Sequence, residues 1–241
     1  MSYRLYTDLA AWWPHLAERE SHENEALLLQ SLLDEASGSR VESILDMGSG
    51  GGLLASHFDA DRELVLSDLS SEMLAHCRTH NPGRSCHQAD MRTMRLSRTF
   101  SAVLLHDAVM YLTSIEDLQT TFQTAAAHLD PGGVFMVLPD VVKECFEEMC
   151  VVGGSTGVPA AQLLEWHWDP DPSDSTYQLE LSFLLKDEQG KIEAVHESHT
   201  LGLFSRQTYV RCLRAAGLEI IGGLIWDENV LPEVFCARKR R

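Results

Sequence analysis

Ile44-Leu-Asp-Met-Gly-Ser-Gly-Gly-Gly52 is the stretch of sequence that decides the fold. Its apolar beginning is typical of a buried strand, which ends near a carboxylate and runs into a glycine-rich loop before a predicted helix. Glycines let a backbone approach a ligand closely, and a helix that follows such a loop presents unpaired N–H groups to that ligand. The stretch therefore predicts the strand, ligand-binding loop and helix that open a doubly wound α/β sheet.

Strands and helices alternate around this loop. We expect strands at residues 41–47, 63–67, 85–88, 102–105 and 134–138, and helices at residues 52–58, 71–79 and 115–129. Two amphipathic helices, at residues 3–17 and 22–36, precede them, because apolar residues recur in both at helical spacing. Strands that alternate with helices indicate a parallel, Rossmann-like sheet with right-handed crossovers.

The pattern changes after residue 140, where this alternation stops. We expect a helix at residues 141–151, then a glycine-rich link and about three antiparallel strands, in which apolar residues recur at every second position. Residues 141–204 would therefore form an antiparallel β cap that is inserted after strand five of the sheet.

The rest of the chain is predicted to return to the sheet. Ser205 is placed to cap a helix that extends to Ala216, and antiparallel strands at residues 218–226 and 234–238 would close the sheet. The predicted fold is α/β, a doubly wound, Rossmann-like sheet of seven strands with a β cap. The core domain would comprise residues 1–140 and 205–241, with lid helices at its N-terminus, and the cap domain residues 141–204.

The composition excludes several classes of protein. The 241 residues contain 19 Lys and Arg against 36 Asp and Glu, so the formal net charge is −17. This is the wrong sign for a protein that binds nucleic acid or an anionic membrane surface. We expect no membrane span, because no stretch reaches roughly 18 apolar residues. The six cysteines form no Cys-x-x-Cys pair, and with no apolar signal core they favour reduced thiols and a cytoplasmic protein.

Two classes of cofactor fit the glycine loop at first. Gly48-Ser-Gly50 could open a dinucleotide fingerprint, and Asp68 lies 20 residues beyond Gly48, where an acid that binds ribose is expected. However, Leu53 stands where the third glycine of that fingerprint is required. This replacement argues against a dinucleotide, but the glycine loop alone does not exclude it. An NAD-dependent oxidoreductase therefore remains a competing interpretation.

Three carboxylates separate the two cofactor classes. Asp46 stands at the mouth of the loop, Asp68 ends strand two and Asp90 follows strand three. Carboxylates at the ends of neighbouring strands would repel a pyrophosphate bridge. They suit a ligand that has an ammonium, a sulfonium, ribose hydroxyls and an adenine amine. That ligand is S-adenosylmethionine (SAM).

With these motifs the chain resembles the class I SAM-dependent methyltransferases over residues 40–140. The resemblance rests on Leu45-Asp-Met-Gly-Ser-Gly-Gly-Gly52, Leu66-Ser-Asp-Leu-Ser-Ser-Glu-Met-Leu74, Gln88-Ala-Asp-Met91 and Leu129-Asp-Pro-Gly-Gly133. It implies that Asp46, Gly48, Ser49 and Gly50 line the methionine and ribose end of SAM, that Asp68 binds the ribose hydroxyls, that Leu69 and Met73 pack against adenine, and that Asp90 and Met91 hold the adenine amine and ring.

Other segments resemble a narrower group. Leu105-His-Asp-Ala-Val-Met-Tyr-Leu112, Glu165-Trp-His-Trp-Asp-Pro-Asp-Pro172 and Gly202-Leu-Phe204 are similar to a group of small-molecule methyltransferases and, more distantly, to the sugar amine N,N-dimethyltransferases. The resemblance implies a small-molecule acceptor without fixing its identity. We expect these segments to lie over the carboxyl edge of the sheet, where an acceptor must bind.

The expected reaction is an in-line displacement at a sulfonium methyl group. Alignment of donor and acceptor can lower such a barrier by about 7–11 kcal/mol, more than a base typically contributes. His106 follows strand four beside the expected sulfonium site. It is the candidate catalytic base and a cofactor contact, with simple shaping of the site as the alternative.

The remaining candidates are aromatic or polar residues near that edge. Tyr6 is expected to close a lid over the cofactor, or else to pack in a helix, and Tyr111 to line the acceptor site or to pack in the core. A metal site is not expected, because the spacing of His196 and His199 places their rings on opposite faces of a strand. The predicted acceptor contacts are Tyr3, Trp13, Asp107, Tyr111, Trp166 and His196.

The leading function is transfer of a methyl group from SAM to a nitrogen or oxygen atom of a small molecule. A methyltransferase that acts on protein or RNA is an alternative, although the acidic surface opposes RNA. A SAM-binding scaffold without turnover is another, and the intact Asp46, Asp68 and Asp90 argue against it. The chain could act as a homodimer.

The net negative charge is concentrated in the cap. Residues 140–200 contain 13 Asp and Glu but only 3 Lys, so 13 − 3 = 10 net negative charges lie there. These acids would either keep the surface soluble or, where they face the acceptor, favour a neutral or amine acceptor. Glu165 and Glu197 are the candidates for the second role.

Overall fold

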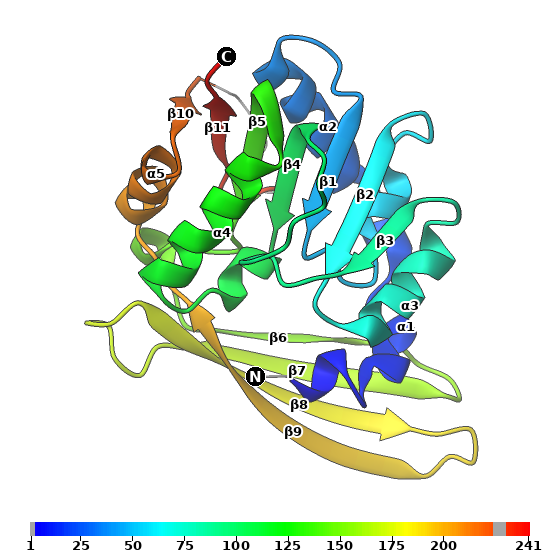
Figure 1. Ribbon diagram of the computed structural model, residues 1–241. Helices are drawn as coiled ribbons and strands as arrows, with labels where there is room; N and C mark the ends of the chain where they lie inside the picture. Colours follow the sequence, from blue (N-terminus) through cyan, green and yellow to red (C-terminus); the bar gives the residue numbers. More distant parts are fainter. Residues whose placement is uncertain (1–2, 224–229) are drawn as a thin grey trace.

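The computed structural model describes residues 3–223 and 230–241. Its central element is a seven-stranded sheet in the order β10-β11-β5-β4-β1-β2-β3 (Figure 1). All neighbours in it are parallel except β11, which is antiparallel to both β5 and β10. The fold prediction is confirmed. The strands are β1 (Ser43–Met47), β2 (Glu63–Asp68), β3 (Ser85–Gln88), β4 (Phe100–His106), β5 (Leu129–Leu138), β10 (Leu218–Ile221) and β11 (Phe235–Lys239).

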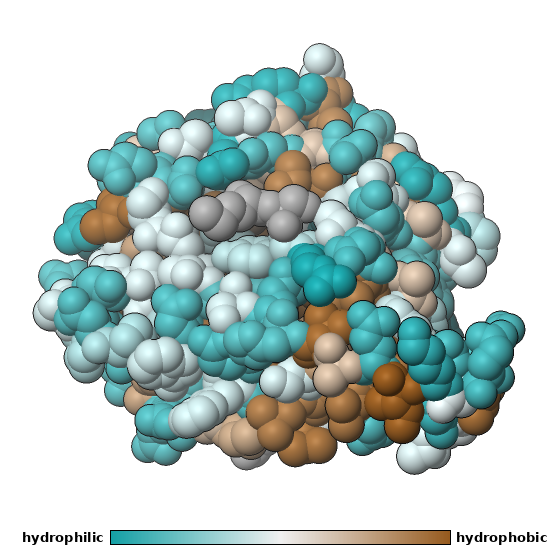
Figure 2. All heavy atoms as spheres, turned by 90° about the horizontal axis from the view of Figure 1, so that it is seen from below, coloured by the Kyte–Doolittle hydropathy of each residue, from teal (hydrophilic) through white to brown (hydrophobic). Residues whose placement is uncertain are grey.

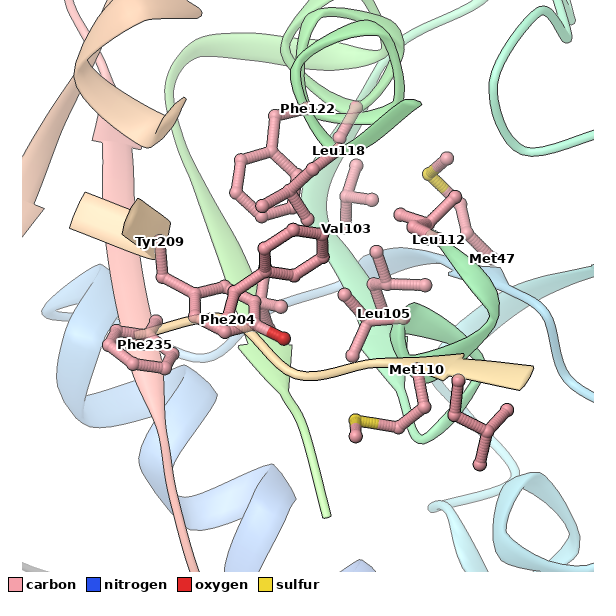
Figure 3. Close-up of a cluster of buried hydrophobic side chains, with 14 of the residues drawn as sticks. Met47, Val103, Leu105, Met110, Leu112, Leu118, Phe122, Phe204, Tyr209 and Phe235 are labelled. Carbon is pink, nitrogen blue, oxygen red and sulfur yellow. The ribbon is translucent and has the colours of Figure 1, made fainter. Parts of the chain in front are cut away.

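Helices cover both faces of this sheet. α2 (Glu23–Ser37) and α3 (Ser71–His80) pack on one face, whereas α4 (Ile115–Ala127) and α5 (Arg206–Ala215) pack on the other. Figure 3 shows Phe122 of α4 and Tyr209 of α5 meeting on the second face. None of the helices in the described residues is long and apolar enough to cross a membrane.

Serine side chains begin three of these helices. Ser70 Oγ accepts from the Met73 N–H at α3, and Ser114 caps α4 in the same way. Ser205 accepts from the Thr208 N–H at α5, as the sequence predicts. Such a cap satisfies a backbone donor that the helix itself leaves unpaired.

The cap is a four-stranded antiparallel sheet in the order β6-β7-β8-β9, which lies beneath the carboxyl ends of the parallel strands in Figure 1. Its strands are β6 (Met149–Gly154), β7 (Ala160–Trp168), β8 (Thr176–Lys186) and β9 (Ile192–Gly202).

The prediction of a helix at residues 141–151 is wrong, and the cap has four strands rather than the expected three or so. Most of that segment is irregular apart from the 3-10 helix η6 (Lys143–Cys145), and β6 follows it. All of β6 is exposed, so burial imposes no periodic pattern on its sequence. Val151-Val-Gly-Gly154 also disfavours a helix, because β-branched residues and glycine have low helix propensity.

The N-terminal helix expected at residues 3–17 is broken into short pieces. They are the 3-10 helices η1 (Arg4–Tyr6) and η2 (Ala10–Trp12), followed by α1 (Trp13–Leu16). Pro14 occupies the first turn of α1, where its missing N–H has no consequence. The helix expected at residues 52–58 is likewise the 3-10 helix η4 (Leu54–His57).

Two strand boundaries also differ from the predictions. β5 already begins at Leu129, and the Asp-Pro-Gly-Gly turn forms an irregularity within its pairing to β4. β10 ends at Ile221, earlier than the strand expected at residues 218–226: residues 222–223 are irregular, and residues 224–226 lie outside the described residues.

Gly202 joins the cap to the core at the end of β9. A Cβ atom at this position would collide with the Leu112 carbonyl oxygen and would lie 2.8 Å from the Phe204 ring. The backbone of the cap can therefore approach the core this closely only because residue 202 has no side chain.

We predict that Gly202→Ala lowers the free energy of unfolding by about 1–3 kcal/mol, the usual effect of overpacking. Gly153→Ala is the matched control, because a Cβ at Gly153 in β6 meets open space; it should leave stability unchanged or slightly raised. Urea unfolding followed by circular dichroism measures both. Equal stabilities for the two variants would contradict the close approach at Gly202.

Candidate active site

The candidate site lies at the carboxyl ends of three neighbouring strands. Asp46 is near the end of β1, Asp68 ends β2 and His106 ends β4. Because β1 pairs in parallel with both β2 and β4, these ends meet at one edge of the sheet, and this edge faces the cap (Figure 1). Such an edge is where doubly wound sheets bind their ligands.

The glycine loop folds back over β2. The N–H groups of Gly48 and Ser49 donate to the Ser67 carbonyl at 2.7 and 2.9 Å. Gly48 has φ of +84°, and a Cβ there would collide with Ala108. Only glycine fits this position, so the loop presents bare backbone as the sequence predicts.

Asp68 is anchored by the loop while it keeps the capacity to bind a ligand. Its two carboxylate oxygens accept from the Gly50 and Ser70 N–H groups, each at 2.8 Å. Burial raises the pKa of Asp68, and these N–H bonds oppose the rise. Each oxygen retains a lone pair for a further donor. The adjacent Leu69 is 61% exposed and offers an apolar surface, whereas Met73 is buried beneath the loop.

Asp90 has a partner that the sequence analysis missed. Arg92 forms a forked ion pair with it, with Nε–Oδ1 and Nη2–Oδ2 distances of 3.0 and 2.7 Å. Hydrogen bonds from Arg92 lower the pKa of Asp90. Asp90 is therefore a fixed anion beside the half-buried Met91, and its predicted contact with the adenine amine stays a prediction.

Asp46 is buried at the mouth of the loop, with 5% of the residue exposed. Burial raises its pKa to about 7, with the charges of Asp68 and Asp107 adding to the rise and His106 opposing it. Its carboxyl group can therefore take up or release a proton near neutrality, and a cationic ligand group nearby would favour the ionised form.

His106 is held between two carboxylates. Its Nε2 lies 2.8 Å from Glu25 Oε1 and 3.1 Å from Asp107 Oδ1. Burial alone would lower the pKa of His106, but the charges of Asp107 and Glu25 raise it to about 10. Burial would raise the pKa of Glu25, but hydrogen bonds from His106 and His22 lower it to about 2.

His106 is thus an imidazolium at neutral pH, the opposite of the state that a base requires. In this structure it positions Asp107 and α2 against the end of β4. The expectation that His106 removes a proton from the acceptor does not fit this geometry.

Four aromatic rings meet where the N-terminal segment crosses the cap. Tyr6 Oη lies 2.6 Å from Tyr111 Oη, which lies 3.1 Å from His199 Nδ1. Tyr3 stacks on His199 with ring centroids 3.8 Å apart. The structure therefore brings together Tyr3, Tyr6 and Tyr111, and it adds the fully buried His199.

Hydrogen bonds fix this N-terminal segment to both domains. The Glu197 carboxylate accepts from the N–H groups of Arg4 and Leu5, and Ser70 Oγ donates to the Tyr6 carbonyl. Glu197 is therefore occupied with the N-terminal segment rather than facing an acceptor.

Trp13 lies on the glycine loop rather than beside an acceptor. A Cβ at Gly51 would lie 2.6 Å from Trp13 Nε1, and no hydrogen-bond partner for this buried atom is found among the described residues. Trp13, which was expected to contact the acceptor, therefore packs on the glycine loop instead.

Trp166 and His196 do not line the carboxyl edge, which corrects two predicted acceptor contacts. Trp166 is 49% exposed and donates to Glu148, and His196 lies 2.8 Å from Glu180 on the outer side of the cap. Side chains alternate along a strand, and the inward positions of β9 are those of Val195, Glu197 and His199. The apolar residues Val195 and Leu201 share the face of His199. This pattern could have predicted that His199, and not His196, points inward.

Asp140 and Glu25 are further residues that the sequence analysis missed. Asp140 lies two residues after the end of β5. The criterion that selected Asp46 and Asp68, an acid at the carboxyl end of a predicted strand, could therefore have found it. No sequence pattern connects Glu25 of α2 to His106, since they are about eighty residues apart.

The residues present fit SAM. The loop offers a backbone cradle that a Cβ at Gly48 would fill, Asp68 retains lone pairs for hydroxyl donors, and Leu69 is an exposed apolar neighbour. When bound, SAM supplies a methyl group on a sulfonium that leaves readily.

Comparisons with known proteins agree with this fit. A family model described as a methyltransferase domain matches residues 44–133. A dTDP-3-amino-3,4,6-trideoxy-alpha-D-glucopyranose N,N-dimethyltransferase of Streptomyces venezuelae is 31% identical over 195 residues, which cover 80% of each chain. A dTDP-3-amino-3,6-dideoxy-alpha-D-glucopyranose N,N-dimethyltransferase of Streptomyces fradiae is 29% identical and covers 86% of this chain and 81% of its own.

Solved structures share the whole fold. The crystal structure of Streptomyces venezuelae DesVI superposes with a TM-score of 0.80 at 25% identity, covering 98% of this chain and 97% of that one. SAM-bound CalS10, an amino pentose methyltransferase from Micromonospora echinaspora, gives a TM-score of 0.76 at 24% identity and covers 99% and 98% of the two chains.

Fold and site together define a Rossmann-like methyltransferase that uses SAM. The chain belongs to the family of SAM-dependent methyltransferases that includes the sugar amine N,N-dimethyltransferases. It transfers a methyl group from SAM to a small molecule.

We predict that Glu25→Gln lowers the free energy of unfolding by about 1–3 kcal/mol at pH 6, because it removes a charged hydrogen-bond partner of a buried imidazolium. The folded pKa of His106 is raised, so its contribution is complete below pH 6.5 and is lost as the pH rises through about 10. The folded pKa of Glu25 is lowered, so the contribution of Glu25 to stability is complete above pH 4.5 and is lost as the pH falls through about 2. The difference from wild type should therefore be largest between pH 4.5 and 6.5.

Chemical denaturation across this pH range measures the effect. The control is Glu63→Gln, which breaks an exposed ion pair with Arg98 and should matter little. A pH-independent difference, or one equal to that of the control, would show that the pairing of Glu25 with His106 does not stabilise the fold.

Proposed function

We propose that this enzyme methylates the amino group of an amino sugar. The observation that carries the proposal is the 31% identity, over 80% of the chain, to an enzyme that dimethylates a 3-amino sugar. The acidic character of the carboxyl edge supports it, since an ammonium is a suitable partner for carboxylates. Two successive transfers to one nitrogen would yield the dimethylamine.

We assign the residues of this edge as follows. Asp68 binds the ribose hydroxyls and Leu69 covers the adenine, while the N-terminal segment with Tyr3 and Tyr6 excludes water from the methyl group. Alignment then contributes most of the rate enhancement. The protein would work in the cytoplasm, which its six free cysteines support.

The test is incubation with methyl-labelled SAM and dTDP-3-amino-3,6-dideoxyglucose, followed by mass spectrometry. We expect two sequential methyl additions, and none to the matched sugar that carries a 3-hydroxyl group. Asp68→Asn should weaken SAM binding at least tenfold in calorimetry, which is about 1.4 kcal/mol. Asp61→Asn, at an exposed acid paired with Arg40, is the control that should bind normally. Absence of SAM binding by the wild type would refute the proposal.

We also propose that the enzyme is a homodimer that pairs through the outer face of the cap. Val152, Leu164, Trp166 and Leu184 are 70%, 41%, 49% and 53% exposed on that side. Figure 2 shows apolar side chains gathered among polar ones on the lower surface of the molecule. A soluble monomer rarely exposes a contiguous apolar patch of large size.

Light scattering after gel filtration should give twice the chain mass for the wild type. Leu184→Glu should yield a monomer, whereas Leu27→Glu, at a similarly exposed leucine of α2, should not change the mass. A monomeric wild type, or a dimeric Leu184→Glu variant, would contradict this interface.

A further inference from the structure

Two carboxyl groups meet where β4 and β5 end. Asp107 follows β4 directly, and its N–H donates to the carbonyl of Leu138, the last residue of β5, at 3.0 Å. Asp140 lies two residues beyond Leu138, and its carboxyl group is a hydrogen-bond partner of the Asp107 side chain. The pair lies on the edge that faces the cap, beside His106.

The backbone at Asp107 is strained. Asp107 has φ of +48° and ψ of −46°, and Ser97 is the one other non-glycine residue with positive φ in the described part of the chain. Such a conformation costs about 1–3 kcal/mol and persists where the surrounding structure enforces it, commonly at functional sites.

Asp140 lies among several titratable groups. Its side chain is exposed to solvent, yet burial among protein atoms is the main reason why its pKa is well above the usual range, and the charge of Asp107 adds to the rise. Besides Asp107, the charged and titratable groups that interact with Asp140 come from six elements: Tyr6 of η1, His106 of β4, Tyr111 of η5 (Ala108–Tyr111), Glu165 of β7, Tyr177 of β8 and Tyr209 of α5.

Two buried tyrosine hydroxyl groups near Asp140 have no hydrogen-bond partner among the described residues. They belong to Tyr177 and Tyr209, which are both 0% exposed. After burial, the charge of Asp140 is the largest influence on the pKa of both hydroxyls, so both lie within range of its charge. A buried, unpaired hydroxyl costs about 1–3 kcal/mol. Their position points to a polar ligand that would pair with them.

We propose that Asp107 and Asp140 form the site that binds the ammonium group of the acceptor and removes its proton, with Glu165 facing it from the cap and the Tyr177 hydroxyl binding an acceptor oxygen. This inference rests on the proposed function and names the catalytic residues for it. The imidazolium of His106 is outnumbered by the carboxyl groups of Glu25, Asp107 and Asp140, so this position favours an ammonium over a neutral hydroxyl.

Binding of the ammonium releases one proton, and methyl transfer moves a second. The ammonium binds to the ionised pair in place of the proton that the two carboxyl groups share, and that proton leaves to solvent. An N–H bond of the ammonium then breaks, its electron pair stays on nitrogen, and the proton goes to a carboxylate oxygen of the pair. The nitrogen lone pair forms the new N–C bond while the C–S bond breaks and its electrons stay on sulfur.

A binding experiment tests the site without requiring turnover. Calorimetry is performed on the whole protein loaded with S-adenosylhomocysteine, with 3-amino-3-deoxyglucose as the probe and glucose as its neutral control. We expect the amine to bind and glucose not to bind. Buffers of different ionisation enthalpy should reveal about one proton released per amine bound near neutral pH. Asp140→Asn should weaken amine binding at least tenfold and abolish the proton release.

Kinetics test the base role. At pH 7, Asp107→Asn and Asp140→Asn should lower kcat/KM for the aminosugar at least about 100-fold, as loss of a general base does. The deficit should shrink as the pH approaches the pKa of the free amine, because the amine then loses its proton to solvent. A purely structural role would give no such pH dependence. Tyr177→Phe should fold as well as the wild type and raise KM several-fold, and Glu188→Gln, an exposed acid of the cap hairpin, should behave as wild type.

The outcomes separate this inference from the proposed function. Methyl transfer to the aminosugar that is unaffected in both aspartate variants, or equal binding of glucose and the amine, overturns the carboxyl-pair site and leaves the function standing. Amine binding that requires the pair, without methyl transfer to any aminosugar, supports the site and overturns the function. Failure of the wild type to bind the amine overturns the site.

Discussion

The parallel pairing of β1 with β2 and β4, and of β4 with β5, is the constraint on which the site depends. It brings the ends of four strands to one edge and with them Asp46, Asp68, Asp107 and Asp140. Residues that are far apart in the sequence become neighbours because the hydrogen-bonded register of the strands fixes where each strand ends. A shift by one residue in any of these strands would turn its side chains to the opposite face and dissolve the site.

So many carboxyl groups at one edge would repel one another without compensation. The structure provides it in three ways. Backbone N–H groups of Gly50 and Ser70 bind Asp68, and Arg92 neutralises Asp90. His106 stands between Glu25 and Asp107 as a cation. At the ends of β4 and β5 the single imidazolium of His106 is outnumbered by carboxyl groups, and a cationic acceptor can neutralise the excess.

The sequence predicts the parts of this arrangement that follow from local patterns. Asp46 and Asp68 can be predicted because each is an acid at the end of an apolar strand. The ligand-binding loop can be predicted from the run of glycines that follows the first of these strands. The sequence does not reveal β6, because an exposed strand carries no periodic signal. Nor does it reveal Glu25, because the amphipathic pattern of α2 specifies its buried face but not which polar residue meets the edge of the sheet. On β9 the spacing of the two histidines predicts opposite faces, and only the apolar neighbours of His199 indicate which one is buried.

The central claim is that this edge holds SAM on the side of Asp68 and a cationic acceptor on the side of Asp107 and Asp140. A crystal structure with S-adenosylhomocysteine and 3-amino-3-deoxyglucose bound tests it most directly. We predict ribose hydroxyls on Asp68 and the sugar nitrogen between the carboxyl groups of Asp107 and Asp140, directed at the sulfur. A ribose bound elsewhere, or a nitrogen that contacts neither aspartate, would contradict it.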